Sequence, residues 1–438
     1  MKSLRYFFRL TKTFISRFKG LFLFGIMVGL LIFFAMLYFI PKISVVKIRV
    51  GVTGRFHTEE LPSVVLSDIG IGLTVLDEAG LPEPGIAEKW ETPDNGRTWI
   101  FTIKDGLVWQ DGSPVTSRTI VYEFTDVETE IPDDKTIIFK LEDPFAPFPT
   151  IVSRPTFRTG LLGTGEWHVD KITAVSSYVS EIVLVNKSHQ KKIYRFYPTE
   201  SQAKLAYKRG EVDMLIEVVD PSPFTTWSTV ESQVEDNTDK VVTLFFNTKD
   251  PLLSDKNIRQ ALDYAIDKTT FDGLTAISPI APSSWAFNSQ VKKYSYSSDR
   301  AKELLKDIPE ELMKEPVKIV SIPTLLPVAE KISDSWNEVG INSIVQVTSI
   351  VPTEFQVYLT ILDIPQDPDQ YALWHSTQEA TNISNYVSPR IDKLLEDGRL
   401  EMNQEERKKI YLDFQRFLTE DLPAAFLYHP QSYTIIRK

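Results

Sequence analysis

The stretch Val317–Val347, VKIVSIPTLLPVAEKISDSWNEVGINSIVQV, carries the pattern that decides the fold class. Its apolar residues predict a short strand at Val317–Val320, a helix at Leu326–Val339 and a second strand at Ile341–Val347. A strand, a helix and a strand in this order suit a parallel sheet with a helix packed on one face. We therefore expect an α/β fold.

The segments on both sides of this stretch extend the α/β pattern. Short strands are expected at Val45–Thr53, Thr98–Lys104, Lys135–Leu141, Ile182–Val185, Lys192–Phe196, Met214–Ile216, Val241–Phe246, Leu422–Tyr428 and Tyr433–Ile436. Helices are expected at Thr116–Phe124, Glu200–Arg209, Ile258–Asp267, Ser298–Leu305, Arg390–Leu400 and Gln404–Thr419. Residues 41–438 are too many for one ordinary core, so we expect two or more lobes.

The N-terminal segment predicts a membrane anchor. Leu21–Ile40 is twenty residues without a charge, and as a helix it spans about 30 Å, the thickness of the hydrocarbon core of a bilayer. Six Lys and Arg residues and no acid precede it, which places residues 41–438 outside the cytoplasm in a single-pass arrangement. The alternative is a cleavable signal peptide, but the run is longer than such peptides need and no A-x-A-like site follows it.

The charge of the chain limits its partners. The net charge is −11, and the first 19 residues contribute +6, which leaves −17 on residues 20–438. An acidic body argues against binding to nucleic acid or to anionic lipid, and we expect no nucleic-acid partner.

No motif for catalysis or for a cofactor is visible in the sequence. The chain has no cysteine, which excludes a thiol nucleophile, a disulfide scaffold and a cysteine-based metal site. The five histidines are isolated and form no H-E-x-x-H motif, and Gly163-Thr164-Gly165 lacks the rest of a phosphate-binding or dinucleotide-binding loop. We therefore expect a binding protein without a cofactor or metal, and not an enzyme.

Several blocks of sequence occur together in a characteristic order. They are GIAEKWETPD (Gly85–Asp94), GRTWIFTIKDGLVW (Gly96–Trp109), DGSPVTSRTIVYEF (Asp111–Phe124), DDKTIIFKLEDPFAPF (Asp133–Phe148), GTGEW (Gly163–Trp167), AYKRGEVDM (Ala206–Met214), FFNTKDPLLSDKNIRQALDYAIDK (Phe245–Lys268), DRAKELL (Asp299–Leu305), DPDQY (Asp367–Tyr371) and IDKLLEDGR (Ile391–Arg399). Each block alone is a weak signal, but their shared order over residues 80–430 is highly specific.

These blocks resemble solute-binding protein family 5, the peptide- and nickel-binding receptors of ABC importers. The resemblance implies a two-lobed periplasmic-binding-protein-like fold (type II, cluster C) with an inserted small subdomain, which closes on a ligand by a hinge motion. It also implies a monomer that binds an oligopeptide or dipeptide and delivers it to membrane permease subunits.

The N-terminal pattern and the resemblance together predict a division of the chain. Residues 1–19 would be a cytoplasmic basic flank and 20–41 the transmembrane helix. Lobe I would span 45–240, with a subdomain at about 75–155, lobe II would span 241–422, and 423–438 would return to lobe I. Only eight residues separate Phe124 from Asp133, where the family has a longer insert, so we expect a shortened subdomain.

The resemblance also points to candidate ligand-binding residues. In the peptide binders, an Asp four residues before the Pro of the Asp-Pro-Asp block captures the amino terminus of the ligand, since a buried ammonium needs a charged partner. Ile364 occupies that position here, and we carry the role over to Asp363, one residue earlier. Asp367 belongs to the same acidic loop, and Trp374 and His375 follow it as candidates to line the cleft.

Two alternatives keep the fold and change the function. A membrane-tethered sensor or surface scaffold would have lost transport, and the absence of permease and ATPase genes nearby would favour it. A receptor for nickel or a metal chelate would need His375 and His429 to converge near the cleft.

Overall fold

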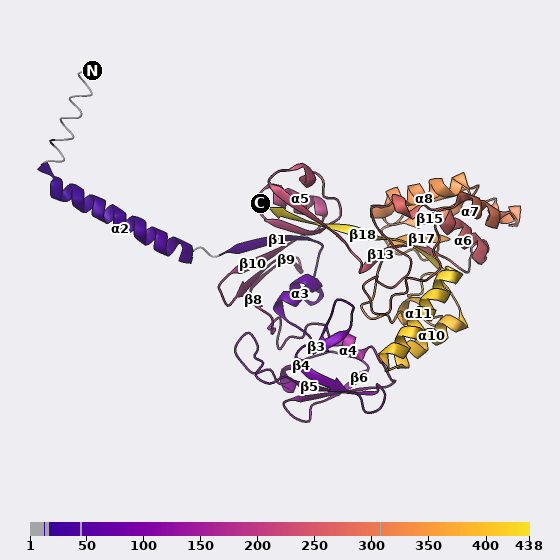
Figure 1. Cartoon of the computed structure of the whole chain (residues 1–438), viewed down its shortest axis with the longest axis horizontal. Coiled ribbons are helices and arrows are strands. Elements are labelled where there is room, and N and C mark those ends of the chain that lie inside the picture. The colour runs from indigo at the N-terminus through magenta and orange to yellow at the C-terminus, as the bar shows by residue number, and fades with distance from the viewer. Residues whose placement is uncertain (1–12, 14–16, 44–45, 307) are drawn as a thin grey trace, which may run out of the picture.

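One large sheet runs through both lobes of the molecule. The computed structural model describes residues 13, 17–43, 46–306 and 308–438, without the side chains of residues 22, 36–43 and 310. Its 12-stranded sheet has the order β16-β15-β17-β13-β18-β11-β1-β10-β9-β8, with β12 and β14 paired to β18 beside this path. β18 (Ala424–Arg437) lies between the two halves, and Figure 1 shows it running from one lobe into the other.

Lobe I is the half of the sheet on the β8 side of β18, with two helices. Its elements are β1 (Lys47–Thr53), α3 (Ser63–Ile69), β8 (Trp167–Val175), β9 (Tyr178–Asn186), β10 (Lys191–Tyr197), α5 (Glu200–Lys208), β11 (Met214–Val218) and β12 (Val230–Asp236). The predicted helix α5 is confirmed. The hydroxyl of Thr199 accepts the amide hydrogen of Gln202 at its start. Gly210, with a φ of 75°, follows its end.

Lobe II is the other half of the sheet with most of the helices. Its elements are β13 (Lys240–Phe246), α6 (Lys256–Tyr264), β14 (Gly273–Thr275), α7 (Ser298–Leu305), β15 (Val317–Ser321), α8 (Leu326–Glu338), β16 (Ser343–Val347), β17 (Val357–Asp363), α9 (Tyr371–Trp374), α10 (Pro389–Leu400) and α11 (Gln404–Asp421). The predicted strand, helix and strand are confirmed, because β15 pairs in parallel with β16 and α8 packs on both. Ile332 and Trp336 of α8 are fully buried in this core.

A small subdomain interrupts lobe I. Its elements are β2 (Thr74–Leu76), β3 (Pro82–Pro84), β4 (Ala87–Glu91), β5 (Thr98–Ile103), β6 (Val127–Glu130), β7 (Thr136–Leu141) and α4 (Phe148–Ile151). Strands β4-β5-β7-β6 form a four-stranded antiparallel sheet. Phe101, Phe139 and Phe148 fill its core with rings 5.2–6.3 Å apart. In Figure 1 the subdomain faces helices α10 and α11 of lobe II.

The helix expected at Thr116–Phe124 is wrong. Only Ser117–Thr119 forms a single 3₁₀ turn, closed by a capping box between Thr116 and Thr119. From Ile120 the backbone is extended, and alternate residues face the aromatic core. The β-branched pair Ile120-Val121 disfavours a helix, and Tyr122 and Phe124 gain more by packing on Phe139.

The two strands expected at the C-terminus are one continuous strand. Residues 424–428 of β18 pair with β13 in lobe II, and residues 431–437 pair with β12 in lobe I. The strand also pairs with β11 at its end. It therefore connects both lobes by main-chain hydrogen bonds.

An N-terminal helix, α2 (Lys19–Ile43), projects from lobe I in Figure 1. Most of the basic flank expected at residues 1–19 lies outside the described residues, as do the side chains of residues 36–43. Over the part of the chain that is described, no helix has the length and apolar character needed to cross a bilayer. The transmembrane helix expected at Leu21–Ile40 is therefore not supported.

Candidate ligand-binding site

A cavity of about 410 Å³ lies between the small subdomain and lobe II. Its volume falls within the range of about 300–1,000 Å³ that is usual for ligand sites. The subdomain contributes Asp77, Leu81, Pro82, Glu83, Trp90, Trp99, Ala146, Pro149 and Thr150, and lobe II contributes Trp285, Asp367, Glu401, Met402, Gln404 and Arg407. Residues from both sides of a hinged molecule therefore share one space.

A second cavity of about 220 Å³ borders the first and shares Asp77 with it. It is lined by the turn Asp77–Gly80, by Asp239 at the start of β13, and by the segments 281–284 and 364–366 of lobe II. Asp77 accepts the amide hydrogens of Ala79 and Leu81 through one carboxylate oxygen, both at 2.8 Å. These bonds fix the turn that separates the two cavities.

Main-chain hydrogen bonds join the subdomain to lobe II beside the cavities. The amide of Trp285 donates to the carbonyl of Ala79 at 3.0 Å, and the amide of Ala146 donates to the carbonyl of Arg399 at 2.7 Å. The guanidinium of Arg399 also lies 5.4 Å from the ring centre of Phe145. The structure therefore has the subdomain and lobe II in direct contact, with both cavities lying between them.

Asp367 lines the main cavity, but a buried ion pair already engages its charge. Arg407 on α11 donates two hydrogen bonds to the carboxylate of Asp367, at 2.8 and 2.6 Å, and both residues are buried. Burial lowers the pKa of Arg407, but the negative charge of Asp367 outweighs this effect, and the net pKa is raised above its usual value. The neighbouring Asp369 pairs with Arg399 at 2.9 Å, and burial raises the pKa of Asp369.

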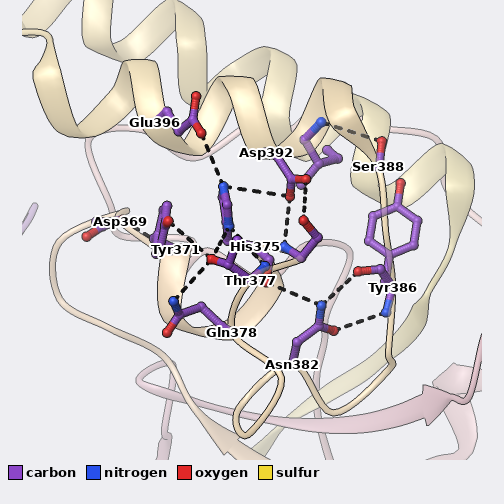
Figure 2. A network of polar contacts seen from close by, with 12 residues as sticks. Asp369, Tyr371, His375, Thr377, Gln378, Asn382, Tyr386, Ser388, Asp392 and Glu396 are labelled. Atoms are coloured by element: carbon purple, nitrogen blue, oxygen red, sulfur yellow. Dashed lines mark hydrogen bonds and ion pairs between the residues drawn. The ribbon is translucent and has the colours of Figure 1, made fainter.

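His375 lies in a polar network between α9 and α10 and does not line either cavity (Figure 2). Its ring stacks on Tyr371 at 4.0 Å, and its Nδ1 is 2.8 Å from the hydroxyl of Thr377. Its Nε2 faces Glu396 at 3.4 Å and Asp392 at 4.0 Å. These contacts anchor the α9 segment to α10.

Trp374 and Asp363 also lie away from the cavity linings. Trp374 is buried against Phe245 and Phe426, and its Nε1 donates to Gln370 at 2.8 Å. Asp363 ends β17 with an exposed side chain, because its neighbours Leu362 and Ile364 point into the core. Of the four sequence candidates, the structure brings only Asp367 to the cavity.

The aromatic and acidic residues that form the walls of the main cavity were not predicted from the sequence. Trp90 and Trp99 come from β4 and β5, Trp285 comes from a loop of lobe II, and Glu83 and Glu401 complete the wall. No local pattern marks these residues, because they come from segments up to about 300 residues apart and meet only after folding.

The arrangement of the histidines does not provide a metal site. His429 on β18 is buried, and its Nδ1 lies 2.8 Å from the carbonyl of Lys240, whereas His375 contacts α10. Within the described residues, no group of three or more His, Asp or Glu side chains is placed to hold a metal ion.

A further cavity, of about 200 Å³, lies inside lobe II and is lined by lobe II residues alone. It contains the buried ion pair of Asp263 and Lys268, at 2.9 Å, for which burial raises the pKa of Asp263. Because hinge closure does not form this cavity, the cavity between the subdomain and lobe II is the stronger candidate for a ligand.

Comparison with known proteins places the fold among extracellular binding proteins. The probable D,D-dipeptide-binding periplasmic protein DdpA of Escherichia coli K12 is 21% identical over 414 residues, which cover 79% of this chain and 78% of the relative. NikZ from Campylobacter jejuni, solved with Ni(L-His), superposes with a TM-score of 0.73 at 20% identity. The ABC transporter substrate-binding protein CtaP from Listeria monocytogenes gives 0.76 at 19%.

In both superpositions, 90% of this chain aligns with 94% of the solved chain. This coverage establishes the two-lobed α/β fold. The comparisons do not confirm the shortened subdomain that we expected. The family model described as bacterial extracellular solute-binding proteins, family 5 (middle part), matches residues 82–382. Since this match spans more than half of the chain, the protein belongs to the bacterial extracellular solute-binding proteins of family 5, whose members bind ligands rather than act as enzymes.

Proposed function

We propose that this chain is the substrate-binding protein of an ABC importer and holds a short peptide in the cavity between the subdomain and lobe II. The observation that carries the proposal is the cavity of about 410 Å³, lined by two parts of a hinged fold that contact each other through main-chain hydrogen bonds. The proteins it resembles include a dipeptide-binding protein and an ABC transporter substrate-binding protein.

The mechanism follows from the position of the cavity. A ligand that contacts both the subdomain and lobe II binds the closed form better than the open form, and this difference in affinity drives closure. Trp90 and Trp99 on one side and Trp285 on the other supply apolar walls. The closed form would then dock, as a monomer, on the permease subunits.

Binding is tested on the purified full chain with pools of di-, tri- and tetrapeptides. A ligand that binds only the folded form raises the free energy of unfolding by about 2.7 kcal/mol at a hundredfold excess over Kd. We expect a rise in melting temperature with at least one pool, and isothermal titration calorimetry then gives the Kd of individual peptides. No shift with any pool at millimolar concentration would rule out the peptide proposal.

A metal chelate is the second candidate ligand, because NikZ was solved with Ni(L-His) and has the same fold. Calorimetry with Ni²⁺ in the presence and absence of L-histidine decides between the two. Tight binding of Ni²⁺ with histidine, together with no response to peptides, would favour the chelate. A third possibility is a sensor or surface scaffold. It would be favoured if the protein binds peptides in vitro but a strain that lacks its gene still takes up peptides normally.

The sequence alone carries the proposal that the chain is held at the outer face of the cytoplasmic membrane. The uncharged run Leu21–Ile40 after a basic flank is its basis, and a cleaved signal peptide is the alternative. Membrane fractionation with alkaline extraction, followed by N-terminal sequencing, separates the two. An intact N-terminus in the extracted membrane pellet supports the anchor, and a released chain that begins beyond residue 40 excludes it.

The division of the chain into 20–41, 45–240, 241–422 and 423–438 is likewise proposed. Limited proteolysis with mass spectrometry tests the first of these boundaries, since cleavage should concentrate near residue 44 and leave residues 45–438 as one resistant product.

A further inference from the structure

The walls of the main cavity carry an excess of negative charge. Asp77, Glu83, Asp367 and Glu401 line it, and Arg407 is the single basic residue in the lining. The bidentate bond to Asp367 takes up the charge of Arg407, so the remaining three carboxylates give the space a net charge of −3. Among the described residues, no basic side chain forms an ion pair with any of these three.

The bordering cavity adds to this excess. Asp77, Glu78 and Asp239 line it, and no Lys, Arg or His belongs to its wall. Asp77 faces both cavities, and its orientation is fixed by the amides of Ala79 and Leu81. A ligand that extends from one cavity into the other would therefore meet carboxylates along its whole length.

The aromatic residues of the wall complement this charge. Trp90, Trp99 and Trp285 line the main cavity from opposite sides. The face of a tryptophan ring attracts an ammonium or guanidinium group, and this attraction is stronger where water is displaced.

From these observations we propose that the cleft selects a cationic ligand: a short basic peptide whose ammonium or guanidinium groups meet the carboxylates and tryptophans. Among the described residues that line the cleft, none offers a free cation for a carboxylate of the ligand. This inference rests on the proposed function and specifies the class of peptide.

The physical reason is that a ligand seated between the two walls displaces water, which lowers the effective dielectric around its charges. There, two charges a few ångströms apart interact several times more strongly than in water, so a ligand carboxylate next to three uncompensated carboxylates is repelled and an added ammonium is attracted. We expect each positive charge added to the ligand, or each carboxylate removed from it, to lower the Kd about tenfold. This factor corresponds to a modest change in binding free energy.

The test uses four matched dipeptides titrated into the purified full chain by calorimetry. Lys-Ala-amide, Ala-Ala-amide, Ala-Ala and Glu-Ala each differ from the next by one unit of net charge, on a dipeptide backbone of constant length. We expect the Kd to rise in this order, by about tenfold per step, and the spread to shrink as salt is added, because salt screens the interaction.

Variants identify the charges responsible. Glu83→Gln and Glu401→Gln should each reduce the preference for Lys-Ala-amide over Ala-Ala-amide about threefold to tenfold while Ala-Ala-amide still binds. Glu235→Gln is the matched control, because Glu235 is exposed on β12 of lobe I and lines neither cavity; it should leave the preference unchanged.

The outcomes separate this inference from the proposed function. Equal binding of all four dipeptides, or a preference for Glu-Ala, overturns the charge selection and leaves a peptide-binding protein. No binding of any dipeptide, together with no response to the longer peptide pools, overturns both.

Discussion

The backbone amide of Trp285 in lobe II donates a hydrogen bond of 3.0 Å to the carbonyl oxygen of Ala79 in the small subdomain. The two residues are about 200 positions apart in the sequence and lie on opposite sides of the candidate ligand cleft. Next to Ala79, Gly80 approaches lobe II so closely that an added Cβ would lie 2.9 Å from the carbonyl oxygen of Gln366. The closed arrangement therefore depends on backbone contact across the cleft.

Gly80→Ala should impair closure. Gly80 has a φ of 83°, which an L-residue rarely adopts, and the new methyl group would collide with Gln366. We expect the Kd for a peptide ligand to increase at least tenfold. Gly112→Ala is the control, since Gly112 has a φ of 82° but open space around it, and it should affect stability without affecting affinity. Equal losses of affinity in the two variants would contradict a role for the contact with Gln366.

Trp374→Ala and Trp285→Ala should have different effects. Trp374 is 1% exposed in the core of lobe II, so its removal should lower the free energy of unfolding by about 3–5 kcal/mol. Trp285 is partly exposed and lines the cavity, so its removal should weaken ligand binding with a smaller effect on stability. Urea denaturation and calorimetry measure the two quantities. A larger loss of affinity from Trp374→Ala than from Trp285→Ala would show that the cleft lies elsewhere.

Arg407→Met should be strongly destabilising, because it leaves the buried carboxylate of Asp367 without its partner. Removal of one member of a buried ion pair costs about 3–5 kcal/mol of folding free energy. The double variant Asp367→Leu with Arg407→Met should recover most of that loss, since no unpaired charge remains. Urea denaturation of the two single variants and the double variant gives the coupling energy, and purely additive effects would exclude the interaction.

His429 should make stability depend on pH. Its ring is 1% exposed, and burial lowers its pKa, although the hydrogen bond to the carbonyl of Lys240 and the charges of Asp236 and Asp239 partly oppose this effect. Below the ordinary pKa of about 6.5, the unfolded chain binds a proton that the folded chain resists. The contribution of His429 to the free energy of unfolding is therefore fully present above about pH 6.5. It declines as the pH falls towards the lowered pKa of the folded state.

The measurement is the melting temperature at pH 7.5 and 5.5. His429→Gln should show a smaller decrease between these values than the wild-type chain does. His168→Gln, at an exposed position on β8, should behave like the wild type. An identical decrease in the His429→Gln and wild-type proteins would remove His429 as the cause.

Local patterns predicted many elements of the fold because they are written in neighbouring residues. The cap at Thr199 and the glycine at 210 delimit α5, and the apolar periodicity of Val317–Val347 specifies β15, α8 and β16. The expectation failed at Thr116–Phe124, where a cap and a turn were followed by residues that pack as an extended segment on the aromatic core. There the tertiary contacts of Tyr122 and Phe124 outweighed the local signal.

The candidate site was much less predictable. The sequence led to Asp363, Asp367, Trp374 and His375, which are close along the chain, yet only Asp367 lines the cavity. The side chain of Asp363 is exposed because strand alternation turns Leu362 and Ile364 inward instead. Trp374 and His375 are engaged by Gln370, Thr377 and α10 within lobe II.

The sequence by itself therefore determined the α/β class, the acidic character of the body and the resemblance to a solute-binding family, because each depends on composition, local periodicity or short motifs. Only the tertiary structure decided which carboxylates remain uncompensated in the cleft and which tryptophans face it. Arg407 neutralises Asp367 from 40 residues away, and Ala79 meets Trp285 across two separate parts of the fold. Contacts of this kind depend on how the hinge and the packed cores position distant segments, and no local pattern encodes that placement.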